Sequence, residues 1–455
     1  MQQKKSIGFG FRGWMLILYQ AIAYITFQVF TQYPLNILAD FYGGAQLVSN
    51  IYSICAIVGI VVQVLLAGLI AKMKSIKTFG SILGAISLVL AFLVMTMTPG
   101  PVWYAAYALI NIVSVLYATL ALGLLVGQWF PTRKGTVMGI ATLAFPIANG
   151  LLGPFASSVF APLGMAEAMG QPAIPFGIGN PIFMAFLPFL IVSIVGWLIG
   201  LIFIKDYPEQ CGAFRDNDKS LTPEIATQIM LAEIENKKTS VWNYLNTIKC
   251  KEFWFGSISV AALLSCAIGL MSQSMQIVNA GIGEEKYSAV MATVMIFGCI
   301  GSYVIGLIDT KIGTKKAMVI SCVLMVIAGV LGLIGSGTIL WIAMIFVAMF
   351  MGASSNFGVS LCAQYWRRED FGRVFALMSP IGSAISSASP VVIAGLLFGA
   401  TGYKGHGGAF AFVLIFGIVA LVLMLAFNPK SIKARDDKYR AKAGKPLDDA
   451  LVGRK

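Results

Sequence analysis

Charged residues are scarce in this chain, and its long apolar runs contain no Asp, Glu, Lys, Arg or His away from their ends. Charged residues make up 11% of the 455 residues, whereas hydrophobic residues make up 58%, and the mean hydropathy is +0.84. So little charge cannot cover the surface of a water-soluble globule of this size. The composition therefore predicts an all-α membrane protein.

Further absences limit the chemistry. His406 is the single histidine, so no histidine-built metal site can form. The chain has no Gly-x-x-x-x-Gly-Lys-Ser/Thr sequence, which leaves ATP-driven transport without a phosphate-binding loop. The apolar runs hold neither paired carboxylates nor a nucleophile beside a base, which a membrane-embedded enzyme needs. We expect no catalytic residue, no metal and no cofactor.

The apolar runs are long enough to cross a bilayer, because about 20 mostly apolar residues in a helix span the hydrocarbon core. The first set of runs is Gly13–Phe30, Val48–Ile70, Phe79–Met97, Tyr104–Gln128, Thr136–Ala161 and Pro181–Ile204. The second set is Phe253–Ala280, Ser288–Ile308, Ala317–Ile334, Ile339–Gln364, Arg373–Phe398 and Ala409–Phe427. We predict twelve transmembrane helices in two pseudo-symmetric six-helix bundles.

A polar stretch separates the two sets and predicts the domain organisation. We expect an N-terminal bundle at 1–204, a linker at 205–252, a C-terminal bundle at 253–427 and a tail at 428–455. Within the linker, Thr222–Lys237 starts with Pro223 in its first turn and predicts a surface helix. The tail is mostly basic, and we expect it to contact anionic lipid headgroups.

Lysine and arginine lie almost entirely on one side of the predicted membrane. Of the 32 such residues, all but Lys286 and Lys404 fall in segments that the twelve helices place on the side of the two termini. Because cationic residues resist translocation, this side is predicted to be the cytoplasm of a cell (plasma or inner) membrane. The same clusters account for the net charge of +13, so nucleic acid is not an expected partner.

The two halves resemble each other in sequence. Trp129–Gly135 follows the fourth run, and Trp366–Gly372 follows the tenth with the same Trp-to-Gly spacing. The next run contains Pro146 in the first half and Pro380 in the second. Two related bundles favour a central cavity between them and a rocking motion of one against the other.

One loop of the second half carries a recognisable pattern: Gly306, Asp309, Lys311, Gly313 and Lys315 follow in this order. It resembles the loop signature of the major facilitator superfamily, and the corresponding loop at 68–77 keeps the basic residues but lacks the acid. The resemblance covers nearly the whole chain. It implies a secondary transporter that works by alternating access.

The loop pattern also predicts a gate. Asp309 lies at the end of the eighth run, where its carboxylate can pair with Lys311, Lys315 or the basic residues Arg367 and Arg373. Such a network would hold one closure of the carrier and break in the other. The alternative is a solvated acid at a helix end, without a gating role.

Within the superfamily, the segment Tyr207–Asp218 and the loop at 309–316 resemble the oxalate/formate antiporter branch. This resemblance implies a carrier of small organic acids. Members of that branch that bind dicarboxylates have a cationic residue in the eighth and in the eleventh helix. Neither run has one here, so oxalate itself is not expected.

Neutral polar stripes lie on the runs that would line the cavity. The candidates for substrate contact are Tyr24, Gln28, Tyr107, Asn111, Gln276, Asn279, Asn356 and Ser360. Because polar side chains are costly against lipid, these stripes face protein or water. They either contact substrate or form hydrogen bonds between helices. Asn149 is instead interpreted as a partner for backbone groups that Pro146 leaves free.

The uncharged runs limit the substrate. Amides, hydroxyls and helix ends can hold one carboxylate, but two less readily. We favour transport of a small monocarboxylate or an aromatic or amphipathic acid by a monomer, by antiport or proton-linked symport. One alternative is an exporter of neutral or amphipathic drug-like solutes. Another, of a different class, is a membrane sensor that does not transport.

Overall fold

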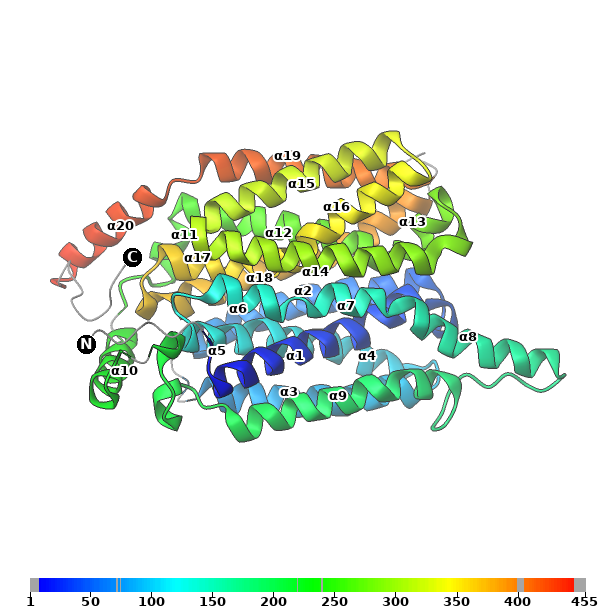
Figure 1. The fold of residues 1–455 in the computed structure, drawn as a ribbon, viewed down its shortest axis with the longest axis horizontal. Coiled ribbons are helices and arrows are strands. Elements are labelled where there is room, and N and C mark those ends of the chain that lie inside the picture. The colour runs from blue at the N-terminus through cyan, green and yellow to red at the C-terminus, as the bar shows by residue number, and fades with distance from the viewer. Residues whose placement is uncertain are drawn as a thin grey trace.

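The computed structural model describes residues 8–70, 73, 75–218, 220–238, 240–398 and 405–445. Every regular element within these ranges is a helix. In Figure 1 the long helices run side by side, and α10 (Pro223–Lys238) and α20 (Pro429–Lys442) lie at one end of them. We call this the linker end and the opposite end the far end. Lys404 and the tail beyond Lys445 lie outside the described residues.

In the described part of the first half there are nine α-helices, some of which continue one another. They are α1 (Phe11–Asn36), α2 (Ala45–Ile70), α3 (Ile76–Thr96), α4 (Pro101–Val115), α5 (Leu122–Trp129), α6 (Lys134–Ala141), α7 (Ala144–Gly150), α8 (Leu152–Ala168) and α9 (Pro181–Phe203). The π-helical segment η2 (Leu116–Ala121) joins α4 to α5.

The linker helices α10 and α11 (Tyr244–Ile248) lead to the second half. Its helices are α12 (Lys251–Ser272), α13 (Ser274–Gly281), α14 (Tyr287–Ile312), α15 (Thr314–Ile334), α16 (Thr338–Ser354), α17 (Phe357–Tyr365), α18 (Arg368–Phe398) and α19 (Gly407–Ala426). Short helices η1 (Ala39–Tyr42), η3 (Pro208–Cys211), η4 (Arg215–Asn217) and η5 (Glu284–Lys286) lie in the connections.

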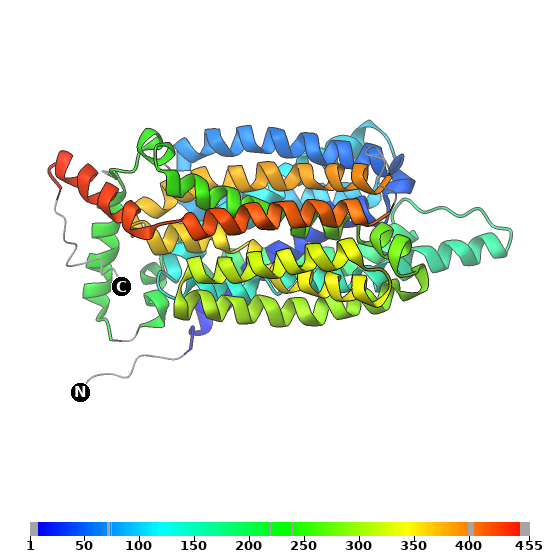
Figure 2. The ribbon, with the colours of Figure 1, turned by 90° about the horizontal axis from the view of Figure 1, so that it is seen from above.

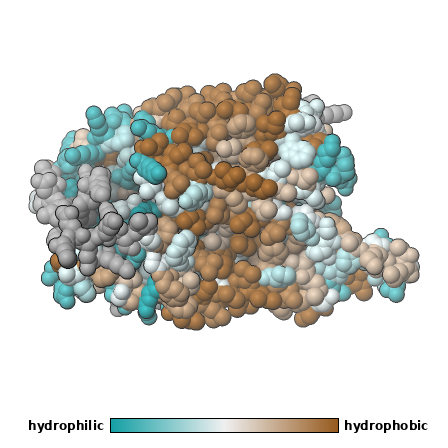
Figure 3. Space-filling model, viewed as in Figure 1, coloured by the Kyte–Doolittle hydropathy of each residue, from teal (hydrophilic) through white to brown (hydrophobic). Residues whose placement is uncertain are grey.

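The number of membrane spans agrees with the prediction. Within the described residues, 11 helical segments are long and apolar enough to cross a membrane, and α16 with α17 makes a twelfth if this pair, bent by 47°, is one span. Figure 3 shows a broad hydrophobic band across the middle of the molecule and hydrophilic patches toward its ends. The all-helical membrane class is confirmed.

Breaks in the spans were not predicted. The fifth span is divided into α6, α7 and α8, and Pro146 in α7 has no N–H for the helix ladder. The tenth span breaks after Ser354, whose hydroxyl donates to the carbonyl of Met351 at 2.6 Å. Serine bonds of this kind bend helices, because they compete with the backbone ladder. Both breaks lie beside the cavity described below.

Glycines let the two halves approach closely along α6 and α14. A Cβ atom on Gly306 would lie 2.9 Å from the Cα atom of Gly139, so the two backbones are in direct contact. Next to this contact, the backbone N–H of Thr136 donates to the Thr310 hydroxyl at 2.8 Å. Figure 1 shows α6 and α7 running alongside α14, and Figure 2, from above, shows α10 and α20 again at one end.

Candidate substrate-binding cavity

A cavity lies between the two halves of the chain. Its walls come from α1, α2, η2 and α7 of the first half and from α12, α16, α17 and α18 of the second half. The space between atoms is about 970 Å³, including the part open to solvent. A site between the halves is what a rocking carrier needs, because both sides of the membrane can reach it in turn.

No charged side chain lines the cavity within the described part of the chain. The polar lining residues are Gln28, Gln32, Tyr52, Thr119, Asn149, Ser354, Ser355, Ser379, Ser383, Ser386 and Ser387. Helix α12 contributes apolar side chains alone, namely Val260, Leu264, Ala267, Ile268 and Met271. The lining is therefore neutral, with polar side chains on elements of both halves and an apolar wall on α12.

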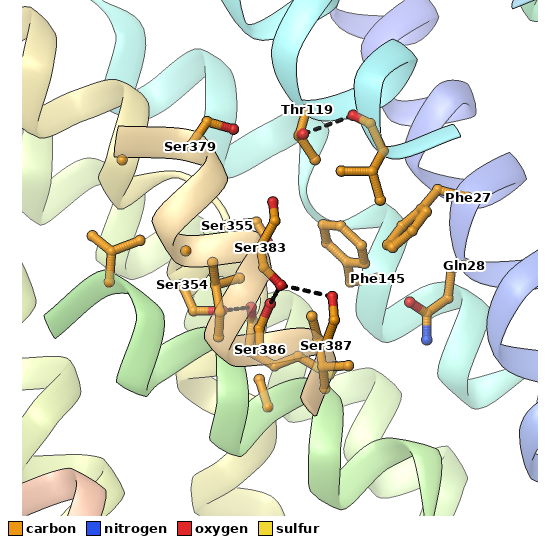
Figure 4. Close-up of a pocket in the computed structure, with 18 of the residues that line it drawn as sticks. Phe27, Gln28, Thr119, Phe145, Ser354, Ser355, Ser379, Ser383, Ser386 and Ser387 are labelled. Carbon is orange, nitrogen blue, oxygen red and sulfur yellow. Dashed lines mark hydrogen bonds between the residues drawn. The ribbon is translucent and has the colours of Figure 1, made fainter. Parts of the chain in front are cut away.

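A row of serines on α18 supplies much of the polar lining of the cavity. Ser379, Ser383 and Ser387 are four residues apart and so share one face of the helix. Figure 4 shows the serines of this row across the cavity from Phe27, Phe145 and Gln28. The Ser387 hydroxyl donates to the carbonyl of Ser383 at 2.6 Å, whereas the Ser383 hydroxyl makes no hydrogen bond to the described residues.

The sequence search missed this row, although the spacing is visible in the sequence. The predicted substrate contacts all lie on the first and fourth helices of each half. The eleventh span lies outside that set. A test for polar residues at helical spacing on every span would have found the row.

Amide side chains of the first half add polar groups across the cavity from the serine row (Figure 4). The Gln28 amide donates to Asn149 Oδ1 at 3.4 Å, and the Gln32 amide donates to the Tyr52 hydroxyl at 2.9 Å. The Asn149 amide donates to the carbonyl of Phe145 at 2.9 Å, so it does bind backbone next to Pro146. The interpretation of Asn149 as a backbone partner is incomplete, because the same side chain lines the cavity.

Three other predicted contact residues lie in the packed first half. The Tyr24 ring packs against Phe145, with ring centroids 4.7 Å apart. The Tyr107 hydroxyl donates to the carbonyl of Thr31 at 2.7 Å, which joins α4 to α1. The Asn111 amide donates to the Tyr107 carbonyl of its own helix at 2.6 Å. In this conformation Tyr24 and Tyr107 hold helices together, Asn111 bonds within its own helix, and none of the three lines the cavity.

The predicted residues of the second half are also outside the lining. The Asn356 amide donates to the Thr142 hydroxyl at 3.1 Å and joins the two broken spans. Ser360 is buried, and its hydroxyl oxygen has no hydrogen-bond partner among the described residues. Gln276 is partly buried on α13, and Asn279 is exposed there. Of the eight candidates, Gln28 alone lines the cavity; substrate contact stays a prediction for the others.

The far end of the cavity is closed by a contact between the halves. The Asn36 amide, at the end of α1, donates to the carbonyl of Met271 at 2.8 Å and to the Ser274 hydroxyl at 3.1 Å. These partners lie on either side of the break between α12 and α13. Met271 itself lines the cavity, so the contact lies at its edge.

At the linker end, Asp309 has a different partner from the predicted one. Its Oδ1 accepts a hydrogen bond from the Thr314 hydroxyl at 2.5 Å, and it makes no ion pair with the described residues. Lys315 instead donates to the carbonyl of Phe427 at 2.6 Å, at the end of α19, and Lys311 is exposed. The expected ion pair is therefore absent in this conformation. A gating role for Asp309 stays a prediction.

Arg367 belongs to a buried charge cluster with the tail helix α20. Its Nε donates to Asp436 Oδ2 at 2.8 Å, and the Trp242 indole donates to Asp436 Oδ1 at 2.9 Å. Burial alone would raise the pKa of Asp436, but these two hydrogen bonds and the nearby arginines lower it below its usual value. Arg440 pairs with Glu369 in the same cluster, and Arg373, partly buried, lies one turn further along α18.

The linker binds both halves. Arg215 pairs with Glu209 at 2.6 Å and with Glu233 of α10, and Glu233 also pairs with Arg368 of α18 at 3.4 Å. On the other side, Asp216 accepts a hydrogen bond from the backbone N–H of Thr132, in the loop after α5, at 3.1 Å. These contacts, buried at Arg215 and Glu233, run from the first half to the second across the linker end.

The fold is shared with solved transporters. XylE, a proton:xylose symporter bound to 6-bromo-6-deoxy-D-glucose, aligns over 91% of this chain and 95% of its own, with 13% identity and a TM-score of 0.63. The human organic anion transporter MFSD10 aligns over 91% and 97%, with 12% identity and a TM-score of 0.59. The E. coli fucose:proton symporter FucP aligns over 91% and 98%, with 13% identity and a TM-score of 0.56. Identities this low show a common fold alone.

Sequence comparison identifies the family. No curated protein matches the chain. The family described as Major Facilitator Superfamily matches residues 118–390 and 253–452, two overlapping stretches that together cover more than half of the 455 residues. The helical architecture and the cavity between the halves agree with this match. The chain belongs to the Major Facilitator Superfamily and is a multi-pass membrane transporter, not an enzyme.

Proposed function

We propose that this transporter carries a small organic acid with one carboxylate and an apolar body. The observation that carries the proposal is the neutral cavity, in which polar side chains from both halves lie beside the apolar wall of α12 and no described residue adds charge. Such a cavity matches a molecule that is itself polar at one end and apolar at the other.

The polar lining residues of the cavity can hold one carboxylate. The hydroxyls of Ser383 and Ser355 make no hydrogen bond to the described residues, and each of the amides of Gln28 and Gln32 has a second N–H to offer. An anion meets no repelling carboxylate there. A second carboxylate would lack a cation to offset its desolvation, so dicarboxylates should bind poorly.

The apolar lining residues of the cavity can hold the apolar body of the substrate. The α12 residues face it together with aromatic rings such as Phe27, Phe145 and Phe375. Burial of apolar surface gains roughly 25 cal/mol per Å², which favours acids with an aromatic or branched aliphatic group over formate or acetate.

The comparisons leave the substrate open, since the similar structures include two sugar:proton symporters and an organic anion transporter. Support comes instead from the cavity and from the resemblance of Tyr207–Asp218 to the oxalate/formate antiporter branch. Without a carboxylate in the cavity, we propose coupling by exchange or by the substrate's own proton. We place the transporter in the cell membrane as a monomer, with the basic linker end and both termini in the cytoplasm.

A specific observation favours a second candidate, a neutral solute that bears hydroxyl or amide groups. The hydroxyls of Thr119, Ser354 and Ser387 all donate to carbonyls of their own helices. Their free lone pairs then face the cavity as acceptors. Such a wall suits hydrogen-bond donors on the substrate.

Matched compounds test the proposal. Purified protein is tested for thermal stabilisation by 3-phenylpropionate, its amide and its alcohol, and then for counterflow of the best ligand in proteoliposomes. Stabilisation by the acid alone supports the organic-acid carrier, because at a given ligand concentration the gain in stability rises with the logarithm of the affinity. Equal stabilisation by the amide and alcohol supports the neutral carrier. Stabilisation without counterflow would indicate a sensor.

A further inference from the structure

Two stacked phenylalanines of α18 pack against two glycines of α5. Phe371 and Phe375 are four residues apart, with ring centroids 5.7 Å apart and ring planes 6° from parallel. Opposite them, Gly123 and Gly127 are also four residues apart, on α5. A Cβ atom on Gly123 would lie 3.4 Å from Phe375 Cε1, and one on Gly127 would lie 2.8 Å from Phe371 Cζ.

The stack runs from the cavity toward the linker end. Phe375 lines the cavity, and Phe371 lies one turn nearer to the start of α18. Beyond Phe371 the Nζ atom of Lys134, on α6, lies 3.6 Å from the centroid of the ring. Lys134 is 6% exposed and makes no ion pair with the described residues, so the ring face is its contact with negative charge.

The contacts of the two rings with the glycines and with Lys134 join the two halves. The glycines and Lys134 belong to the first half, and both phenylalanines belong to the second. A flat ring on a glycine strip can withdraw without passing other side chains, because glycine presents no Cβ atom. Separation of the halves at the linker end would lift both rings off α5 and uncover Lys134.

We propose that Phe371 and Phe375, seated on Gly123 and Gly127, form the linker-end gate of this transporter. Phe375 is the inner face of the gate and borders the bound substrate. Lys134 holds the outer ring in the closed position. The gate is separate from the charge network predicted at Asp309, and it holds for any substrate class.

The two glycines provide a matched pair of variants. Gly127→Ala places a methyl group against the Phe371 ring and close to Lys134 Nζ, whereas Gly123→Ala makes only ordinary van der Waals contact with Phe375. Spin labels at Thr78 and Lys316, which are exposed at the starts of α3 and α15, measure the separation of the halves at the linker end. Cys211 and Cys299, which are partly exposed, are changed to serine in this background.

We expect Gly127→Ala to raise the ratio of open to closed linker ends about tenfold, the usual scale of an overpacked contact. Gly123→Ala should change this ratio less than about twofold. Equal effects of the two variants, or no effect of Gly127→Ala, would overturn the proposal.

A second-site change keeps the test independent of folding. Phe371→Leu removes the ring that the new methyl group meets, so the double variant Gly127→Ala/Phe371→Leu should be no more open than Phe371→Leu alone. Such non-additivity is expected of groups in direct contact. If Gly127→Ala does not fold, Phe371→Leu by itself must open the linker end relative to the parent. A closed Phe371→Leu variant refutes the gate.

Discussion

Arg367 and Asp436 form a buried ion pair, with 2.8 Å between Nε and Oδ2 and exposures of 5% and 1%. The pair fastens the tail helix α20 to the corner between α17 and α18. Because Trp242 of the linker binds the same carboxylate, one side chain joins the tail, the linker and the second half.

Asp436→Asn should release α20 from this corner. The change leaves Arg367 buried beside a neutral amide, and removal of one partner of a buried pair costs about 3–5 kcal/mol. Limited trypsin digestion should then cleave the tail faster than in the parent, while the spans stay intact. The matched control is Asp437→Asn on the same helix, where the side chain is half-buried and makes no ion pair with described residues. Equal cleavage of both variants would show that the pair does not hold the tail.

Tail docking should also depend on pH in a defined direction. Asp436 has a pKa below the usual 3.8, so its ionised form is favoured in the docked state. The stability from this group is therefore fully present above the usual pKa and is lost as pH falls through the lower, docked-state pKa. Comparison of the parent with Asp436→Asn at each pH isolates this contribution: the difference in hydrogen exchange of residues 430–442 should be present at pH 5 and above and should shrink as pH falls below the usual pKa of 3.8. A difference that is already lost near pH 6 would contradict this.

Glu233 should be needed for the contact of the linker with both halves. It pairs with Arg215, which is buried, and with Arg368, which is partly buried, so Glu233→Gln leaves both guanidinium groups without their shared carboxylate. We expect a loss on the order of 3 kcal/mol in unfolding free energy, seen as a lower midpoint in detergent. Glu224→Gln, at an exposed position of the same helix, is the control and should change the midpoint little. An equal midpoint for the two variants would show that the ion pairs of Glu233 do not stabilise the folded protein.

The contact between α6 and α14 should not tolerate a methyl group. Gly306→Ala brings its Cβ atom to 2.7 Å from the carbonyl oxygen of Gly135, and both sides of this contact are backbone. The overpacking should cost about 1–3 kcal/mol. Gly395→Ala, on α18, meets nothing within 4 Å and should be neutral or stabilising, since alanine favours helix more than glycine does. Thermal midpoints of the two variants check this, and similar midpoints would contradict the backbone contact.

Substrate affinity should depend on the serine row. Ser383→Ala removes a hydroxyl that faces the cavity and should weaken binding by about 1 kcal/mol, roughly fivefold in Kd. Ser389→Ala is the control, because Ser389 is buried on the same helix but outside the lining. Kd values from ligand-induced thermal shifts compare the two. A weaker Ser389→Ala variant with an unchanged Ser383→Ala variant would remove the row from the site.

Gln276→Ala distinguishes a substrate site on α13, as predicted from the sequence, from a site confined to the cavity. If the polar stripe on α13 contacts substrate, the change should weaken affinity and leave the folded yield unchanged. If binding is confined to the cavity lining, where Gln28 lies and Gln276 does not, Gln28→Leu should weaken affinity instead. Uptake kinetics of both variants decide between the two sites.

The spans could be read from the sequence because hydropathy alone specifies them. The breaks could not, since they depend on single side chains such as Ser354 bonding to its own helix. Asn149 shows a further limit. Its spacing from Pro146 correctly indicated a backbone bond, but its contact with Gln28 depends on how α1 and α7 pack.

The partners of charged residues were the hardest part to predict. Asp309 was expected to pair with Lys311, Lys315, Arg367 or Arg373, yet Arg367 binds Asp436, 69 residues away along the chain. Nothing in the local sequence specifies such a partner. The spacing of Ile432, Asp436 and Arg440, four residues apart in a polar tail, is nevertheless a helix signal that could have been used.

The uncharged lining of the cavity has an electrical consequence. When the halves rock around the site, no charged lining residue among those described is carried through the centre of the bilayer. The membrane voltage then acts on the cargo alone, at about 2.3 kcal/mol for each elementary charge per 100 mV. A lone monocarboxylate would therefore produce a current, whereas a neutral solute, an acid with its proton, or a one-for-one exchange of anions would be electrically silent.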